Sequence, residues 1–439
     1  MFKPMATRFY AALANTDNIA YFDEEGKRTR VSNTNVLPPI IRSSILLSLW
    51  YKAEIHYTTR DEPLDKTANP SFKPGDITHI FADCGAYNYR NENPVLRDKK
   101  TPLDSTIAWS RYQEEHFPPD TKIKQILLCA PDQILYEDHD EYEFERRRKY
   151  NLKQANEFLT SFPEQLDSDI VIPVGVIHGR NVMERKQHFD SLIDMGYRYV
   201  ALGGMVPFAS RRRRTTALDI VAGLDPDAEN PAVCDDSILA RCRRENLGLH
   251  IFGLNAPEWM RWWIRLGVDS YDGSKLSTEG AKNGTYWTPM DGEFGRPNYR
   301  NLKPTSANDM YERTLVGTFG IEDVPNFWTK DAGNYSVNSH PITPNGYSTA
   351  CECDACNYFT KSRCTSPRCW GAKRWPDDDH VSDPRCMGST EHNMGRMAHN
   401  AHIYEWMMLE MIKMNSEANE KFAKGELEGD SYLHNWRSI

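Results

Sequence analysis

The sequence shows short apolar runs that end in a polar residue or glycine and are followed by longer amphipathic segments. Apolar runs of about four to eight residues are typical of buried strands, and apolar residues every three or four positions are typical of helices. The runs lead to these residues: Asp83, Asp132, His178, the pair Gly203 and Gly204, Phe252 with Asn255, and Asp272. The pattern predicts helices over Glu141–Ser161, Asn181–Met195 and Ala256–Leu266. We expect Asn255 to cap the last of these, with Pro257 in its first turn.

Strands that alternate with helices predict a parallel sheet, because a parallel connection needs a long crossover segment. In a (β/α)8 barrel the active site lies at the carboxyl ends of the strands, where this sequence places Asp, His and Gly residues. We therefore predict an α/β fold of the (β/α)8 TIM barrel type. A doubly wound open sheet is the alternative, but no G-x-G-x-x-G motif follows the first strand.

The amino-acid composition changes after Gly284, and the segment up to Tyr347 is rich in Trp, Tyr, Pro, Asn and Gly. Cysteines then cluster, and a long amphipathic helix is predicted from Asn393 to Ala423. We predict two parts. Residues 1–284 hold an N-terminal region and the catalytic barrel, and residues 285–439 hold an inserted zinc-binding subdomain and a C-terminal helical part that completes the barrel.

A metal site is predicted from Cys351, Cys353 and Cys356, which form C-x-C-x2-C, with His399 and His402 further along. Three thiolates and one imidazole complete a tetrahedral zinc site with no position open for water, which is a structural site. The alternative is three free thiols in a loop. A second cluster leaves open whether it binds metal or consists of reduced thiols in an insertion: Cys364, Cys369, His380 and Cys386.

Composition narrows the classes of protein that fit. The chain has 439 residues, 39% of them hydrophobic, which is enough for a large core and excludes disorder of the whole chain. No run approaches the roughly 18 apolar residues of a membrane span, and the N-terminus lacks the apolar region of a signal peptide. We expect a cytosolic (cytoplasmic) protein with reduced cysteines. The net charge of −9 argues against indiscriminate coating of nucleic acid.

Several motifs in the same order resemble the tRNA-guanine transglycosylases, zinc-containing (β/α)8 enzymes that exchange guanine for a 7-deazaguanine base. The resemblance covers roughly residues 75 to 410. Family motifs C-x-C-x2-C and H-N-x-H-x-Y match residues 351–356 and 399–404, which selects His399 as the fourth zinc ligand. Family motifs G-V-D-x-F-D, L-G-G and D-S-G-G-[FY]-Q match residues 267–272, 202–204 and 83–88.

The resemblance implies that Asp272 is the nucleophile that attacks the anomeric carbon of the target nucleotide and forms a covalent glycosyl-enzyme intermediate. A carboxylate suits this role, since it is ionised at neutral pH and stabilises an oxocarbenium-like centre. Asp83 is implied as the second carboxylate, which moves protons. Taken alone, Asp272 would be interpreted as a helix cap and Asp83 as a turn former.

The resemblance also implies a base pocket. Asp132 would accept hydrogen bonds from the guanine N1–H and exocyclic amine, and the backbone of Gly203 and Gly204 would present N–H groups to the base carbonyl. Tyr87 and Phe252 match the residues that sandwich the base, although either ring could instead fill the barrel.

The sequence departs from the family at recognition positions. His178 replaces the glutamine of G-x-x-Q-G, and Glu279 and Lys282 replace both arginines of T-R-x-A-R-x-G. A carboxylate repels phosphate, so anticodon-loop recognition of the usual kind is not expected. With the N-terminal 75 residues and the insertion between Cys356 and His399, these departures resemble the DNA-guanine transglycosylases, which insert 7-cyano-7-deazaguanine into DNA.

We therefore predict a DNA-guanine transglycosylase with structural zinc, DNA and a 7-deazaguanine base as substrates, and a separate ATPase or helicase-type subunit as a candidate partner. Basic residues near the pocket are expected to contact phosphates: Arg211, Arg212, Arg213, Arg214 and Lys282, with Arg241, Arg243 and Arg244 as possible additions. The alternatives are a tRNA-guanine transglycosylase and a non-catalytic zinc-binding subunit. A glycosidase acting on sugars leaves the cysteine triplet unexplained.

Overall fold

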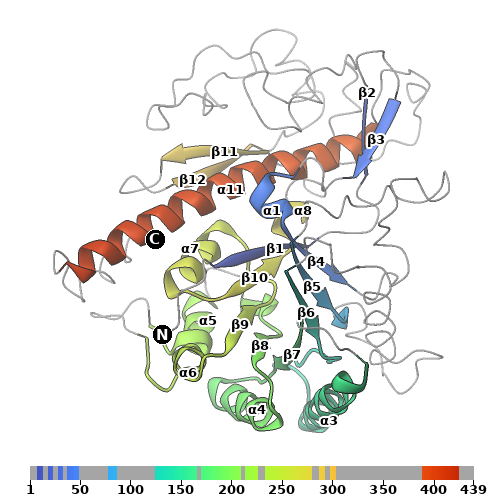
Figure 1. The fold of residues 1–439 in the computed structure, drawn as a ribbon, viewed down its shortest axis with the longest axis vertical. Coiled ribbons are helices and arrows are strands. Elements are labelled where there is room, and N and C mark those ends of the chain that lie inside the picture. Colours follow the sequence, from blue (N-terminus) through green and yellow to red (C-terminus); the bar gives the residue numbers. More distant parts are fainter. Residues whose placement is uncertain are drawn as a thin grey trace.

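The computed structural model describes residues 7–12, 18–22, 28–32, 37–48, 78–86, 124–165, 170–208, 213–225, 233–278, 286–291, 297–302 and 388–424. Within these ranges, eight parallel strands close into a barrel in the order β1-β10-β9-β8-β7-β6-β5-β4 (Figure 1). The strands are β1 (Arg8–Ala12), β4 (Ser44–Ser48), β5 (His79–Asp83), β6 (Gln125–Cys129), β7 (Val171–Ile177), β8 (Tyr199–Leu202), β9 (Gly248–Ile251) and β10 (Ser270–Gly273). The predicted barrel is confirmed, and the doubly wound open sheet is wrong.

Two barrel strands lie in the N-terminal region that the family motifs do not reach. β1 pairs with β10 on one side, with Arg8 opposite Ser270, and with β4 on the other, with Ala11 opposite Ile45. Each strand has only five residues, which is too short for the apolar pattern to predict the pairing. These ladders to β10 and β5 make the N-terminal residues part of the barrel wall.

The described helices pack on the outside of the barrel. They are α1 (Pro39–Arg42), α3 (Glu141–Gln165), α4 (Val182–Met195), α5 (Arg214–Ala222), α6 (Ile238–Glu245), α7 (Pro257–Leu266), α8 (Lys275–Ser277) and α11 (Gly388–Ala423), with a 3-10 turn η6 (Val206–Phe208). The predicted helices after β6, β7 and β9 are confirmed. α4 begins as the sequence indicates, because the Asn181 side chain accepts the Glu184 N–H at 2.9 Å.

The predicted cap of α7 is wrong. The N-cap residue is Ala256, which has no side chain able to accept a hydrogen bond. The Asn255 side chain turns to β10 instead: its Nδ2 donates to the Gly273 carbonyl at 3.0 Å, and its Oδ1 accepts the Lys275 N–H at 3.1 Å. Asn255 therefore joins the carboxyl ends of β9 and β10.

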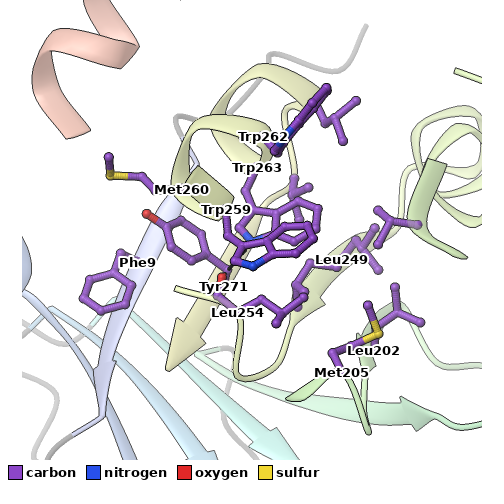
Figure 2. Close-up of a cluster of buried hydrophobic side chains, with 14 of the residues drawn as sticks. Phe9, Leu202, Met205, Leu249, Leu254, Trp259, Met260, Trp262, Trp263 and Tyr271 are labelled. Carbon is purple, nitrogen blue, oxygen red and sulfur yellow. Dashed lines mark hydrogen bonds between the residues drawn. The ribbon is translucent and has the colours of Figure 1, made fainter. Parts of the chain in front are cut away.

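The apolar residues separate into an outer and an inner cluster. Outward side chains of the strands pack against the helices, and inward side chains such as Phe81, Leu127 and Val174 fill the barrel. Figure 2 shows the aromatic part of the outer cluster, where the Trp259 and Trp263 rings stack with centroids 5.3 Å apart. α7 buries both rings against β9 and β10, which carry residues of the candidate site.

The long helix α11 lies across the outside of the barrel and contacts α7, α8, α1 and the strands β2 (Asn18–Phe22), β11 (Tyr286–Asp291) and β12 (Pro297–Leu302) (Figure 1). β2 forms an antiparallel pair with β3 (Arg28–Ser32), and β11 does so with β12. Tyr404 on α11 is fully buried and donates to the Asn255 carbonyl at 2.8 Å. Glu405 accepts the Ile40 and Ile41 N–H groups of α1 at 2.8 and 3.0 Å.

Among the described helices, none has the length and apolarity to cross a membrane.

Candidate active site

The barrel gathers the predicted polar residues at one end. Asp83 is the last residue of β5, and Asp132 follows β6 by three residues. His178 follows β7 directly, and Gly203 follows β8. Asp272 is the last residue but one of β10. Because all eight strands are parallel, these carboxyl ends share one mouth, as in barrel enzymes generally.

Asp83 lies in an environment that favours its neutral form. Burial is the largest cause that raises the pKa of Asp83 to about 8, and the negative charges of Asp132 and Asp272 add to it. The Gly85 N–H donates to Asp83 Oδ2 at 3.1 Å and opposes the shift only in part. Asp83 is therefore protonated at neutral pH and can give a proton to a neighbouring group.

Asp132 is buried and held from two sides. Its Oδ1 accepts a hydrogen bond from the Cys84 thiol at 2.9 Å, and its Oδ2 lies 2.7 Å from His178 Nε2. Burial raises the pKa of Cys84 to about 11, so the sulfur keeps its proton and donates. His178 is nearly inaccessible to solvent, and its backbone N–H lies 3.0 Å from His188 Nδ1. The predicted base-binding pair is thus a linked unit with a fixed orientation.

The loop after β8 requires its two glycines. A Cβ on Gly203 would lie 2.6 Å from His178 Cε1, and Gly204 has a φ of +64°. The Gly203 N–H donates to the Ile177 carbonyl at 3.0 Å, so this predicted donor is already used by the β7–β8 ladder. Among the described residues, none accepts the Gly204 N–H, which leaves it for a ligand.

A buried arginine supports this loop from behind. Arg185 on α4 is 1% exposed, and its Nη1 donates to the Gly203 carbonyl at 2.9 Å. Burial lowers the pKa of Arg185 to about 10, which still leaves the guanidinium charged at neutral pH. The hydrogen bond fixes the plane of the Gly203–Gly204 peptide, whose N–H is the one left for a ligand.

Asp272 is buried, and one of its oxygens is fixed. Its Oδ1 accepts the Gly253 N–H at 2.9 Å and lies 3.3 Å from His250 Nε2. Gly253 has a φ of +77°, and a Cβ there would lie 2.6 Å from Val206, so only glycine fits this turn after β9. The turn therefore presents its backbone donor to Asp272.

Phe252 lies beside the inner aromatic cluster. Its ring meets Phe81 and His250 edge to face, with centroids 5.3 and 4.7 Å apart, and it is only partly buried. Phe252 therefore presents an apolar surface close to Asp272, whereas Tyr87, the other predicted sandwich residue, lies outside the described residues.

The basic residues separate into two groups. Arg213 pairs with Glu137 and lies over the Phe208 ring at 4.8 Å, so it joins two loops of the barrel mouth. Arg214 is the first residue of α5, and Arg211, Arg212 and Lys282 lie outside the described residues.

The suggested addition of Arg241, Arg243 and Arg244 to the substrate face is wrong. These residues lie in the last two turns of α6, which ends just before β9 begins and is therefore at the amino end of the strands. Arg243 donates to the Leu266 carbonyl, and Arg241 pairs with Asp190. They stabilise the opposite end of the barrel.

The predicted zinc ligands Cys351, Cys353 and Cys356 lie outside the described residues, as does the second Cys and His cluster. His399 is described and is 4% exposed on α11. The described ranges contain no group of three metal-ligating side chains. As a donor set, three thiolates and one imidazole have the chemistry of a structural zinc site.

Sequence reasoning missed several residues around the carboxylates. Cys84 stands at the serine of the family motif, and its contact with Asp132 is visible only in the structure. His250 and Ser270 precede Phe252 and Asp272 by two residues, so a period-two strand places them on the same inner face. This two-residue spacing is the sequence feature that could have pointed to His250 and Ser270. Nothing in the sequence marks Arg185, because a charged residue on a helix is usually exposed.

Fold and site together define a class of protein: a closed parallel barrel whose mouth holds Asp83, Asp132 and Asp272. No protein-family model matches the chain. The chain is 26% identical over 271 residues to a DNA-guanine transglycosylase from Salmonella montevideo. The match covers 60% of this chain and 56% of the relative, so the chain spans about half of that protein's length. This similarity confirms the predicted resemblance to the guanine transglycosylases and its DNA branch.

Proposed function

We propose that this chain is a DNA-guanine transglycosylase that exchanges guanine in DNA for 7-cyano-7-deazaguanine. The observation that carries the proposal is the pair of unlike carboxyl groups at the barrel mouth: Asp83, which holds its proton to about pH 8, and Asp272, whose Oδ1 accepts two hydrogen bonds. A carboxyl group that holds its proton, beside a second carboxyl group whose orientation is fixed by hydrogen bonds, suits one acid/base and one nucleophile. The relative's name supports DNA over tRNA.

The proposed reaction has two displacements. Asp272 attacks C1′ of the target deoxyguanosine, the N-glycosidic bond breaks, and guanine leaves with the bonding electrons while it takes a proton from Asp83. The incoming base then gives a proton to Asp83, attacks C1′ through its ring nitrogen, and releases Asp272 as a carboxylate. Asp132 and the Gly204 N–H would hold the base edge, and Phe252 would cover one face.

The proposed function also includes a structural zinc ion and a partner subunit. Cys351, Cys353, Cys356 and His399 would hold a structural zinc ion that links the cysteine segment to α11. A base in duplex DNA must leave the stack before Asp272 can reach C1′, so a subunit that opens the duplex is a candidate partner.

The experiment supplies the protein with duplex DNA, single-stranded DNA or tRNA, each with 7-cyano-7-deazaguanine, and digests the nucleic acid to nucleosides for mass spectrometry. We expect the modified deoxynucleoside from DNA and none from the matched Asp272→Asn variant. A modified ribonucleoside from tRNA alone would establish the tRNA alternative. Activity that Asp272→Asn retains in full with a partner subunit would establish the non-catalytic alternative.

A further inference from the structure

A chain of buried polar side chains leads from the barrel wall to Asp272. The Tyr199 hydroxyl lies 2.8 Å from Ser270 Oγ, and Ser270 Oγ lies 2.8 Å from His250 Nδ1. His250 Nε2 lies 3.3 Å from Asp272 Oδ1. All four residues are at most 8% exposed, and His250 is completely buried. The neighbouring strands β8, β9 and β10 supply them, with His250 opposite Ser270 in the ladder.

The chemistry of these groups sets the direction of every hydrogen bond. As the proposed nucleophile, Asp272 acts as a carboxylate, which only accepts hydrogen bonds, so Nε2 of His250 carries the hydrogen. Nδ1 of the neutral imidazole then accepts from the Ser270 hydroxyl, which in turn accepts from the Tyr199 hydroxyl. Burial lowers the pKa of His250, so the ring stays neutral. Its neighbours are aromatic, with Phe81, Phe252 and Tyr10 ring centroids at 4.2, 4.7 and 6.0 Å.

The two oxygens of Asp272 are therefore not equivalent. Oδ1 meets both the Gly253 N–H at 2.9 Å and His250 Nε2. Oδ2 has no donor among the described residues. A carboxylate with one oxygen held by two donors has one orientation, and its free oxygen is the one that can form a new bond.

Resting on the proposed function, we propose that His250 is a positioning residue for the nucleophile, and that Ser270 and Tyr199 fix its imidazole tautomer. His250 and the Gly253 N–H hold Oδ1 so that Oδ2 attacks C1′. In the glycosyl-enzyme, Oδ1 becomes the carbonyl oxygen of the ester and keeps both donors. When the incoming base attacks C1′, the electrons of the Oδ2–C1′ bond return to Asp272, and these donors stabilise the carboxylate that leaves.

The test compares three variants in a single-turnover assay of the covalent DNA adduct, resolved on denaturing gels. His250→Leu removes the donor, His250→Gln keeps a side-chain N–H, and Ser270→Ala removes the hydroxyl that orients the ring. We expect His250→Leu to form the adduct about 100-fold more slowly, as when a preorganised donor is lost. The KM for the incoming base should stay within about threefold of wild type.

Partial recovery of the rate in His250→Gln distinguishes a positioning role of the His250 N–H group from a role in packing alone. His250→Gln should regain at least about tenfold over His250→Leu, and Ser270→Ala should slow adduct formation by about three- to tenfold. Melting temperatures show whether the variants fold, and rates are compared only among variants that melt alike. Equal rates for His250→Leu and His250→Gln, or a loss confined to KM, would overturn the proposal.

A second measurement does not depend on DNA. In nitrogen-15 spectra of histidine-labelled protein, the signal that disappears in His250→Gln should report a neutral Nε2–H tautomer, and Ser270→Ala should mix the two tautomers. An Nδ1–H tautomer in wild type would overturn the relay. If wild type forms no adduct with DNA or tRNA but shows the expected tautomer, the proposed function fails while the geometry at His250 stands.

Discussion

Asp83 combines a half-buried, desolvated carboxyl group with two acidic neighbours, and this combination couples its protonation to the proposed activity and to stability. In the unfolded chain the group ionises at its ordinary pKa of 3.8, whereas in the folded protein it holds its proton to about pH 8. Between these values the folded state binds more protons than the unfolded state. Stability from this group is therefore lost as the pH rises across the interval.

We expect Asp83→Asn to lower the rate of base exchange by at least about 100-fold, because the proton donor is removed. The same variant should melt about 2 °C or more above wild type near pH 8, and with little difference near pH 4, since asparagine stays neutral. Calorimetry at both pH values checks this. Asp138→Asn, an exposed change after the same β6 strand as Asp132, serves as the control and should alter neither quantity. A lower melting temperature for Asp83→Asn near pH 8 would contradict the assignment.

The substitution Gly203→Ala tests whether the loop after β8 and His178 form the pocket for the incoming base. A Cβ there would lie 2.6 Å from His178 Cε1 and 2.7 Å from Val176 Cγ1, so Gly203→Ala must displace the imidazole that meets Asp132. We expect the KM for the incoming base to rise at least about tenfold. Gly175→Ala is the matched control, because its Cβ would press on Leu192 and Tyr197 at 3.1 Å, outside the barrel. That variant should lose stability and keep its KM.

At the scale of elements, α11 joins the C-terminal part of the chain to the barrel at Tyr404. The Tyr404 ring lies 4.9 Å from Phe9 of β1, and its hydroxyl donates to the Asn255 carbonyl between β9 and α7. One side chain therefore contacts a strand that begins at residue 8 and a loop near residue 255. The position of the helix depends on this packing.

Tyr404→Phe should lower the free energy of unfolding by about 1 kcal/mol, the usual effect of losing one buried hydrogen bond. Tyr404→Ala should lower it by about 3–5 kcal/mol, because a large cavity forms between α11 and β1. Leu409→Ala, at an exposed position of the same helix, should change it by less than about 0.5 kcal/mol. Urea unfolding followed by tryptophan fluorescence measures all three. Equal effects of Tyr404→Ala and Leu409→Ala would show that α11 does not stabilise the barrel.

At the scale of the whole molecule, the barrel closes only when the N-terminal strands meet the last one. β1 lies between β10 and β4 in the barrel, so residues 8–12 connect the strand that carries Asp272 to the next N-terminal strand. Asp272 therefore depends on a ladder to the N-terminal region.

The zinc proposal also concerns the whole molecule, since its ligands come from segments more than forty residues apart. We expect about one zinc ion per chain by elemental analysis, reduced severalfold in Cys353→Ser and His399→Ala. His402→Ala is the control and should keep the metal. Retention by His399→Ala together with loss in His402→Ala would assign the ligand to His402 instead.

The sequence by itself determined the kind of fold and most of the carboxylate site. Strand and helix periods are local properties, and a residue that follows a parallel strand must lie at the mouth, so Asp83, Asp132 and Asp272 could be placed without coordinates. The motif order added the prediction of base-exchange chemistry.

Tertiary structure decided what depends on contacts between distant segments. It shows that β1 and β4 are part of the barrel wall and that the Asn255 side chain bonds to β10 instead of capping α7. It also places Arg243 at the end of the barrel opposite the carboxylate mouth. It also joined His250, Ser270 and Tyr199 into one buried relay behind Asp272. The physical reason is that hydrogen-bond partners and burial belong to pairs of residues brought together by the closed barrel, whereas periodicity and motifs belong to single segments.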